Sequence, residues 1–107
     1  MRFCHITLAG WLPLLLVLPS AAAPADAAAL RTEALAATCA ACHGTAGAPL
    51  AQASVPGLAG LPRHYLVEQM AAFKAGRREA TVMHQLAKGY SDAQIEQLAG
   101  YFAALPR

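Results

Sequence analysis

Apolar side chains recur every three or four residues along much of the chain, which is the pattern of helices that bury one face. Residues 26–41 are rich in alanine, the strongest helix former, and are predicted to form the first helix. Residues 61–75 are predicted to form the second helix, with a buried stripe of Leu66, Met70 and Phe73. Glycines follow both segments, and glycine commonly ends a helix.

The C-terminal segment carries the clearest helix signal. Ser91 is followed three residues later by Gln94, which is the signature of a capping box, so a helix is predicted to begin here. Five apolar residues then recur at helical spacing and predict one buried face: Ile95, Leu98, Ala99, Phe102 and Leu105. A short helical turn is predicted over residues 81–88, and no strand-like alternation is present, so the predicted class is all-α.

The first 25 residues have the composition of an export signal. Arg2 provides a positive start, residues 6–18 are an apolar run, and small residues follow that run. The apolar run is short for a membrane span and contains Pro13. We expect residues 1–25 to be removed on export to the periplasm, leaving residues 26–107 as a single domain. An uncleaved membrane anchor is the alternative.

Cys39, Cys42 and His43 form a C-x-x-C-H run, the attachment pattern of c-type haem. Each thiol can add across one vinyl group of the haem, and the histidine can ligate its iron. Positions three and four apart share one helical face, so both sulfurs can meet one haem edge with the imidazole over the metal. Three other kinds of C-x-x-C site find little support. A zinc site needs a second Cys/His pair, a thioredoxin-like site needs a βαβ context, and a disulfide scaffold needs more cysteines.

The iron needs a second axial ligand or keeps an open position. Met70 lies on the predicted buried stripe, and His64 lies on the polar side of the same helix. Met83 lies between the second and last helices, in a segment that can fold over the open haem face. It is preferred over the adjacent His84, because neighbouring side chains diverge and only one can face iron. His/Met ligation raises the reduction potential and suits electron transfer, whereas an open position would suit a sensor or a haem enzyme.

Two further residues are candidates near the haem. A ligand histidine usually donates its second N–H to a backbone carbonyl, and Pro56 is placed to supply one; an ordinary loop proline is the alternative. Tyr90 can approach a haem propionate or can pack against the protein. The basic residues Lys74, Arg77 and Arg78 form a local cluster that suits a solvated helix end, a docking patch or a propionate contact.

The charge and cysteine content of the chain limit the classes of molecule that it is expected to bind. One of the eight basic residues and one of the three cysteines lie in the predicted leader, so seven basic residues, six acidic residues and two cysteines remain. A charge so near balance argues against nucleic acid as a partner. No pair of a nucleophile and a base stands out, so we expect an electron-transfer protein and not an enzyme. About eighty residues bury a modest core, so we expect the chain without haem to be poorly folded.

The order and spacing of these segments cover nearly the whole of residues 26–107 and resemble class I cytochrome c. The segments that carry the resemblance are Cys39-Ala-Ala-Cys-His43-Gly44, Val55-Pro56-Gly-Leu58-Ala-Gly60, Tyr65-Leu66, Phe73-Lys-Ala-Gly76 and Met83. The first and last helices of that family cross, which would place Leu35 against Leu98 and Phe102. Arg31 departs from the pattern, because many relatives place a small residue near this position.

The resemblance implies a small all-α fold of about three main helices and loops wrapped around one covalently bound haem c. In that family two cysteines and a histidine hold the haem, a later methionine is the sixth ligand, and a proline carbonyl bonds the ligand histidine. In this chain these roles fall on Cys39, Cys42, His43, Met83 and Pro56.

Residues 80–91 and 98–102 are similar, more narrowly, to the cytochrome subunit of flavocytochrome c sulfide dehydrogenase. In that enzyme a flavoprotein subunit oxidises sulfide and the cytochrome subunit takes the electrons. The similarity implies that this chain is a periplasmic electron acceptor with a flavoprotein partner. We expect the chain to meet the membrane only during its own export. The alternative is a free soluble shuttle between respiratory or photosynthetic complexes.

Overall fold

The computed structural model describes residues 24–49 and 51–107, and this part of the chain contains helices and loops but no strand. In chain order the elements are α1 (Pro24–Ala37), α2 (Ala40–His43), the 3-10 helix η1 (Thr45–Gly47), α3 (Arg63–Lys74), α4 (Met83–Leu86), the 3-10 helix η2 (Ala87–Gly89) and α5 (Asp92–Ala103). The predicted all-α class is confirmed. The predicted leader, residues 1–25, lies outside the described residues except for its last two, which belong to α1.

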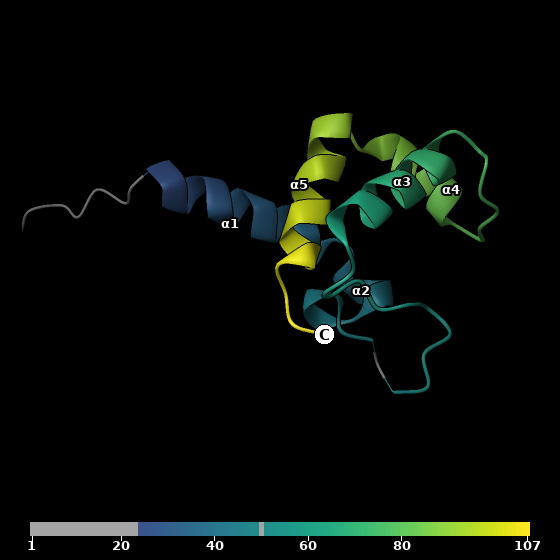
Figure 1. The fold of residues 1–107 in the computed structure, drawn as a ribbon, viewed down its shortest axis with the longest axis horizontal. Helices are drawn as coiled ribbons and strands as arrows, with labels where there is room; N and C mark the ends of the chain where they lie inside the picture. The colour runs from purple at the N-terminus through teal and green to yellow at the C-terminus, as the bar shows by residue number, and fades with distance from the viewer. Residues whose placement is uncertain (1–23, 50) are drawn as a thin grey trace, which may run out of the picture.

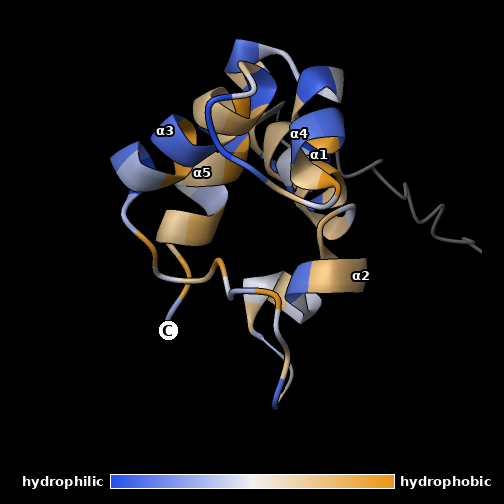
Figure 2. Cartoon of the chain, turned by 90° about the vertical axis from the view of Figure 1, so that its right-hand side faces the viewer, coloured by the Kyte–Doolittle hydropathy of each residue, from blue (hydrophilic) through white to orange (hydrophobic). Residues whose placement is uncertain are grey.

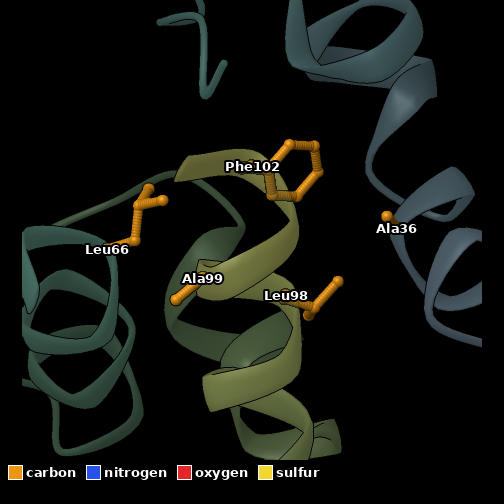
Figure 3. Packing of buried hydrophobic residues seen from close by; sticks show 5 residues of the cluster. All are labelled: Ala36, Leu66, Leu98, Ala99 and Phe102. Atoms are coloured by element: carbon orange, nitrogen blue, oxygen red, sulfur yellow. The ribbon is translucent and has the colours of Figure 1, made fainter. Parts of the chain in front are cut away.

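Helix α5 is the centre of the fold, with α1 packed on one side and α3 on the other (Figure 1). Figure 3 shows this arrangement from close by, with Ala36 of α1 and Leu66 of α3 on opposite sides of the α5 residues. Leu98, Ala99 and Phe102 of α5 are each no more than 5% exposed. The predicted apolar face of the last helix is therefore its core face.

Two helix ends follow from local chemistry that the sequence predicts. The Ser91 hydroxyl accepts from the Gln94 backbone N–H at 3.2 Å, and the Gln94 side chain accepts from the Ser91 N–H at 2.8 Å, so the capping box is confirmed. At the end of α3, Gly76 takes a φ of +70° and the N–H groups of Gly76 and Arg77 bond the carbonyls of Phe73 and Ala72. This pattern is a Schellman motif, which satisfies carbonyls at the helix end.

The prediction of one continuous helix over residues 26–41 is wrong. Helix α1 ends at Ala37, and the Thr38 and Cys39 N–H groups bond carbonyls three residues back rather than four. The Thr38 hydroxyl also donates to the Leu35 carbonyl at 2.7 Å. With this change from four-residue to three-residue bonding α1 ends, and α2 begins anew with Cys39 as its N-cap.

Three of the predicted core positions are less buried than expected, and one of them, Leu105, lies beyond the end of α5. Leu66 and Phe73 of α3 are buried, whereas Met70 between them is only partly buried. On α1 it is Ala36 that is buried against α5, while Leu35 packs partly buried beside it and Arg31 is exposed. Within residues 24–49 and 51–107, none of the helices combines the length and the apolar character needed to cross a bilayer.

The small helix α2 lies apart from the three-helix core. It packs with η1, whereas α4 packs against α3 and η2. Figure 2 shows α2 below the other labelled helices, with the connecting loops running between the two levels. The chain thus presents the C-x-x-C-H run at one level and the Met83 segment at the other.

Candidate functional site

The two thiols of the C-x-x-C-H run lie on a single turn. The N–H groups of Cys42 and His43 both bond the Cys39 carbonyl, at 3.3 and 3.0 Å. Both thiols are free, and Cys42 is exposed while Cys39 is half-buried. Burial raises the pKa of the Cys39 thiol, and the Thr38 hydroxyl beside it opposes that rise.

The ring of His43 is oriented by a backbone carbonyl. Its Nδ1 lies 2.7 Å from the carbonyl oxygen of Pro56. Because a carbonyl oxygen only accepts hydrogen bonds, Nδ1 carries the proton and donates it. The second nitrogen, Nε2, is then left with its lone pair, which is the form of imidazole that ligates a metal.

A close contact with α5 holds the loop that supplies this carbonyl. The carbonyl of Gly47 accepts from the N–H groups of Leu58 and Ala59, at 2.8 and 3.2 Å, so the loop folds back over η1. Gly47 takes a φ of +72°, and a Cβ placed there would lie 2.8 Å from the Phe102 ring. Only glycine suits this position, because it allows both the positive φ and the close approach. The loop therefore stays beside α2, where Pro56 meets the imidazole.

Met83 and His84 begin α4, and both side chains are partly buried. His84 lines an open depression of about 620 Å³, together with five residues of the segment before α4: Gly76, Arg78, Glu79, Ala80 and Thr81. The Nδ1 of His84 is buried and has no hydrogen-bond partner. Met83 is not part of that lining, so the two neighbouring side chains have different surroundings.

The other two candidate ligands lie on α3. His64 is exposed and lines a second open depression, of about 510 Å³, whose remaining walls are side chains of α3 and α5. Met70 is partly buried on the same helix. The described residues contain no group of three or more His, Cys, Asp or Glu that could hold a metal ion.

The basic cluster is divided between two structural roles. Lys74 donates to the Tyr90 carbonyl and to the Asp92 carboxylate, both at 2.8 Å. The ammonium group holds the pKa of the Asp92 carboxyl below its usual range. Arg78 donates to the Gln69 side chain and lies 4.5 Å from the centre of the Phe73 ring. These contacts favour the interpretation of the cluster as a helix end over that of a docking patch.

Tyr90 follows η2 and bonds at both its ends. Its hydroxyl lies 2.9 Å from the Thr38 hydroxyl, and its carbonyl accepts from Lys74. The sequence interpretation did not single out Thr38. A polar residue directly before Cys39 is the only signal of it in the sequence, and that signal does not identify a partner 52 residues away.

These residues fit a covalently attached haem. Two free thiols on one turn suit its vinyl groups, and the free Nε2 of His43 suits one axial position of its iron. The cytochrome c family profile matches residues 29–106. The chain belongs to the cytochrome c family. Membership implies covalently bound haem c, with Cys39 and Cys42 positioned as in the family's C-x-x-C-H motif.

Three relatives agree with this assignment. The chain is 46% identical over 84 residues to the thiosulfate dehydrogenase electron acceptor of Thiomonas intermedia, which covers 78% of this chain and 38% of the relative. It is 38% identical over 77 residues to the cytochrome subunit of sulfide dehydrogenase of Chlorobaculum tepidum, covering 72% and 68%. It is 42% identical over 82 residues to cytochrome c4 of Pseudomonas aeruginosa, covering 77% and 39%.

The chain therefore spans less than half the length of two of these relatives and about two thirds of the third. The names of all three describe cytochromes or electron acceptors. Together with the family match, they make this cytochrome c an electron carrier and not a catalyst. Its single C-x-x-C-H run corresponds to one haem.

Proposed function

We propose that this cytochrome carries single electrons in the periplasm, with haem attached through Cys39 and Cys42 and ligated by His43 and Met83. The hydrogen bond between His43 and Pro56 carries the proposal, because it fixes the tautomer that leaves Nε2 free for iron. Bound haem supplies one-electron exchange between Fe(III) and Fe(II). The chain holds the ligands in fixed positions and contributes no acid, base or nucleophile.

The surroundings of the two neighbours favour Met83 over His84 as the sixth ligand. His84 lines the open depression together with residues 76 and 78–81, and its Nδ1 is buried. Met83 precedes it by one residue and does not share that environment. A thioether in the sixth position stabilises ferrous iron and raises the reduction potential, which suits a carrier that accepts electrons from a dehydrogenase.

The periplasmic location rests on residues 1–25 acting as an export signal that is cleaved. Cleavage would leave residues 26–107 as the mature domain, which includes the whole of the matched range 29–106. N-terminal sequencing of the protein purified from the periplasmic fraction tests this part of the proposal. A protein that retains Met1 and sediments with membranes would instead have an uncleaved anchor.

The proposed electron donor is a flavoprotein that oxidises sulfide. In support of this partner, the chain spans 68% of the Chlorobaculum tepidum cytochrome subunit, so the similarity covers most of that relative. A second donor, a thiosulfate dehydrogenase, is favoured by the higher identity of 46% to the Thiomonas intermedia electron acceptor. In both cases the chain would accept electrons released from an inorganic sulfur compound.

The partner is tested with the oxidised holoprotein. It is mixed with a purified sulfide-oxidising flavoprotein and sulfide, or with a purified thiosulfate dehydrogenase and thiosulfate, and haem reduction is followed by absorbance. Sulfide reduces ferric haem slowly without an enzyme, so each reaction is compared with one that lacks the dehydrogenase. We expect rapid reduction with the flavoprotein. Reduction only with the second enzyme would make thiosulfate the source, and acceleration by neither would favour a free shuttle.

A further inference from the structure

A chain of hydrogen bonds connects the residues just before Cys39 with Tyr90, which follows η2. The Thr38 hydroxyl lies 2.7 Å from the Leu35 carbonyl and 2.9 Å from the Tyr90 hydroxyl. A threonine hydroxyl has one hydrogen, and a carbonyl oxygen can only accept. Thr38 therefore donates to Leu35, and Tyr90 must donate to Thr38.

The other end of Tyr90 is fixed from α3. Its backbone carbonyl accepts a hydrogen bond from the Lys74 ammonium group, which Asp92 at the start of α5 also holds. The body of the Tyr90 side chain packs partly buried against the core cluster. The hydroxyl is thus the free end of a side chain whose backbone and ring are already held in place.

The Thr38–Tyr90 hydrogen bond connects the two segments that carry the candidate haem ligands. Thr38 directly precedes Cys39, and Tyr90 directly follows α4 and η2, seven residues after Met83. Among hydrogen bonds between described residues, this bond alone joins residues 24–61 to residues 76–91. It therefore connects the start of the attachment turn to the end of the segment that carries the sixth ligand.

We propose that the Thr38–Tyr90 hydrogen bond is a positioning link that holds the Met83 segment in register with the haem-attachment turn. The proposal rests on the proposed ligation of iron by Met83. Tyr90 then acts on the axial ligand through the η2 and α4 backbone. Without the link, the Met83 segment opens more often and a competing ligand from solution gains access to iron.

The experiment measures how readily imidazole replaces the methionine in the ferric holoprotein. Tyr90→Phe removes only the hydroxyl, and Thr38→Val replaces the acceptor by a methyl group of the same shape. We expect each variant to bind imidazole about fivefold more tightly than the wild type, the usual effect of one neutral hydrogen bond. The double variant should resemble the single variants, because the two groups form one interaction. Thr38→Ser keeps the hydroxyl and should restore wild-type affinity.

Two controls separate the link from general stability. Tyr101→Phe removes a tyrosine hydroxyl on α5 that makes no hydrogen bond to the described residues. Ile95→Val trims a buried residue of α5 and lowers stability without touching the link. Both should bind imidazole as the wild type does.

The outcomes distinguish failure of the Thr38–Tyr90 link from failure of the proposed ligation by Met83. If ferric wild type shows the weak far-red absorbance band of methionine ligation and Tyr90→Phe binds imidazole no more tightly than Tyr101→Phe, the link is refuted and Met83 ligation stands. If Ile95→Val binds imidazole as tightly as Tyr90→Phe, the effect is general loosening and the link is also refuted. If the wild type lacks the far-red band, the proposed ligation by Met83 fails and this proposal fails with it.

Discussion

The contact between Gly47 and Phe102 predicts a large cost for one added methyl group. In the Gly47→Ala variant, the new Cβ would lie 2.8 and 2.9 Å from two atoms of the Phe102 ring and 3.0 Å from the Leu58 Cβ. The backbone there also has a φ of +72°, a left-handed conformation that alanine adopts only with strain. The substitution therefore combines a backbone cost with a packing cost, at the end of η1, where the loop that carries the Pro56 carbonyl folds back.

The magnitude follows from comparing three glycines. Gly76 has nearly the same φ, +70°, but a Cβ added there would have no neighbour within 4 Å, so Gly76→Ala isolates the backbone cost of about 1–2 kcal/mol. Overpacking adds about 1–3 kcal/mol, so Gly47→Ala should lose about 2–5 kcal/mol. Gly100 lies in the interior of α5 with nothing within 4 Å, so Gly100→Ala should gain about 0.5–1 kcal/mol.

The assay is denaturant unfolding of the wild-type holoprotein and the three variants, followed by far-ultraviolet circular dichroism. The expected order of unfolding free energy is Gly100→Ala, wild type, Gly76→Ala and Gly47→Ala, from the highest to the lowest. If Gly47→Ala cost no more than Gly76→Ala, the loop would not be packed tightly on Phe102. The contact with Phe102 would then not be what keeps Pro56 beside His43.

Three other outcomes are expected. Met83→Ala should keep its haem but lose the far-red band and show a lower reduction potential; a band that persists would exclude Met83 as the ligand. Replacing both cysteines by alanine should leave a chain of low helicity in circular dichroism, because the core is small; native helicity with cooperative unfolding would disprove this. Lys74 holds the pKa of the Asp92 carboxyl below its usual value. The ion pair therefore stabilises the fold above about pH 4, and this stabilisation is lost as the pH falls through the lowered pKa. In thermal unfolding measured against pH, Asp92→Asn should lack this part of the acid sensitivity.

Local chemistry explains which features could be predicted from the sequence. The capping box of Ser91 and Gln94 needs two residues three positions apart, and the glycine end of α3 needs a single residue, so both could be derived from neighbouring letters. The C-x-x-C-H run is equally local, because its three functional groups occupy one turn. Periodicity identified α5 as the core helix, because a helix that buries one face must repeat its apolar residues every three or four positions.

The features that sequence reasoning missed depend on contacts between distant residues or on competition within one turn. Helix α1 ends at Ala37, where the N–H groups of Thr38 and Cys39 bond carbonyls three residues back, whereas alanine content alone favours a longer helix. The Thr38–Tyr90 bond joins residues 52 positions apart, and no periodicity encodes such a pair. The sequence also left the role of the basic cluster open, because Lys74 and Arg78 have partners only once α3 is packed.

The contacts of Phe102 explain how so small a core can position a haem site. This one residue packs in the core cluster with Leu66 of α3, approaches Gly47 of η1, and accepts the Gly60 N–H at 2.9 Å through its backbone carbonyl. Contacts with α5 therefore hold the loop that orients His43. The hydrogen bond from Tyr90 to Thr38 connects the Met83 segment to the start of the attachment turn. An electron carrier gains or loses one electron without making or breaking a ligand bond, so the proposed ligation by His43 and Met83 requires both side chains to stay in place in both oxidation states. The contact of Phe102 with Gly47 and the Thr38–Tyr90 hydrogen bond would each hold one of these two segments.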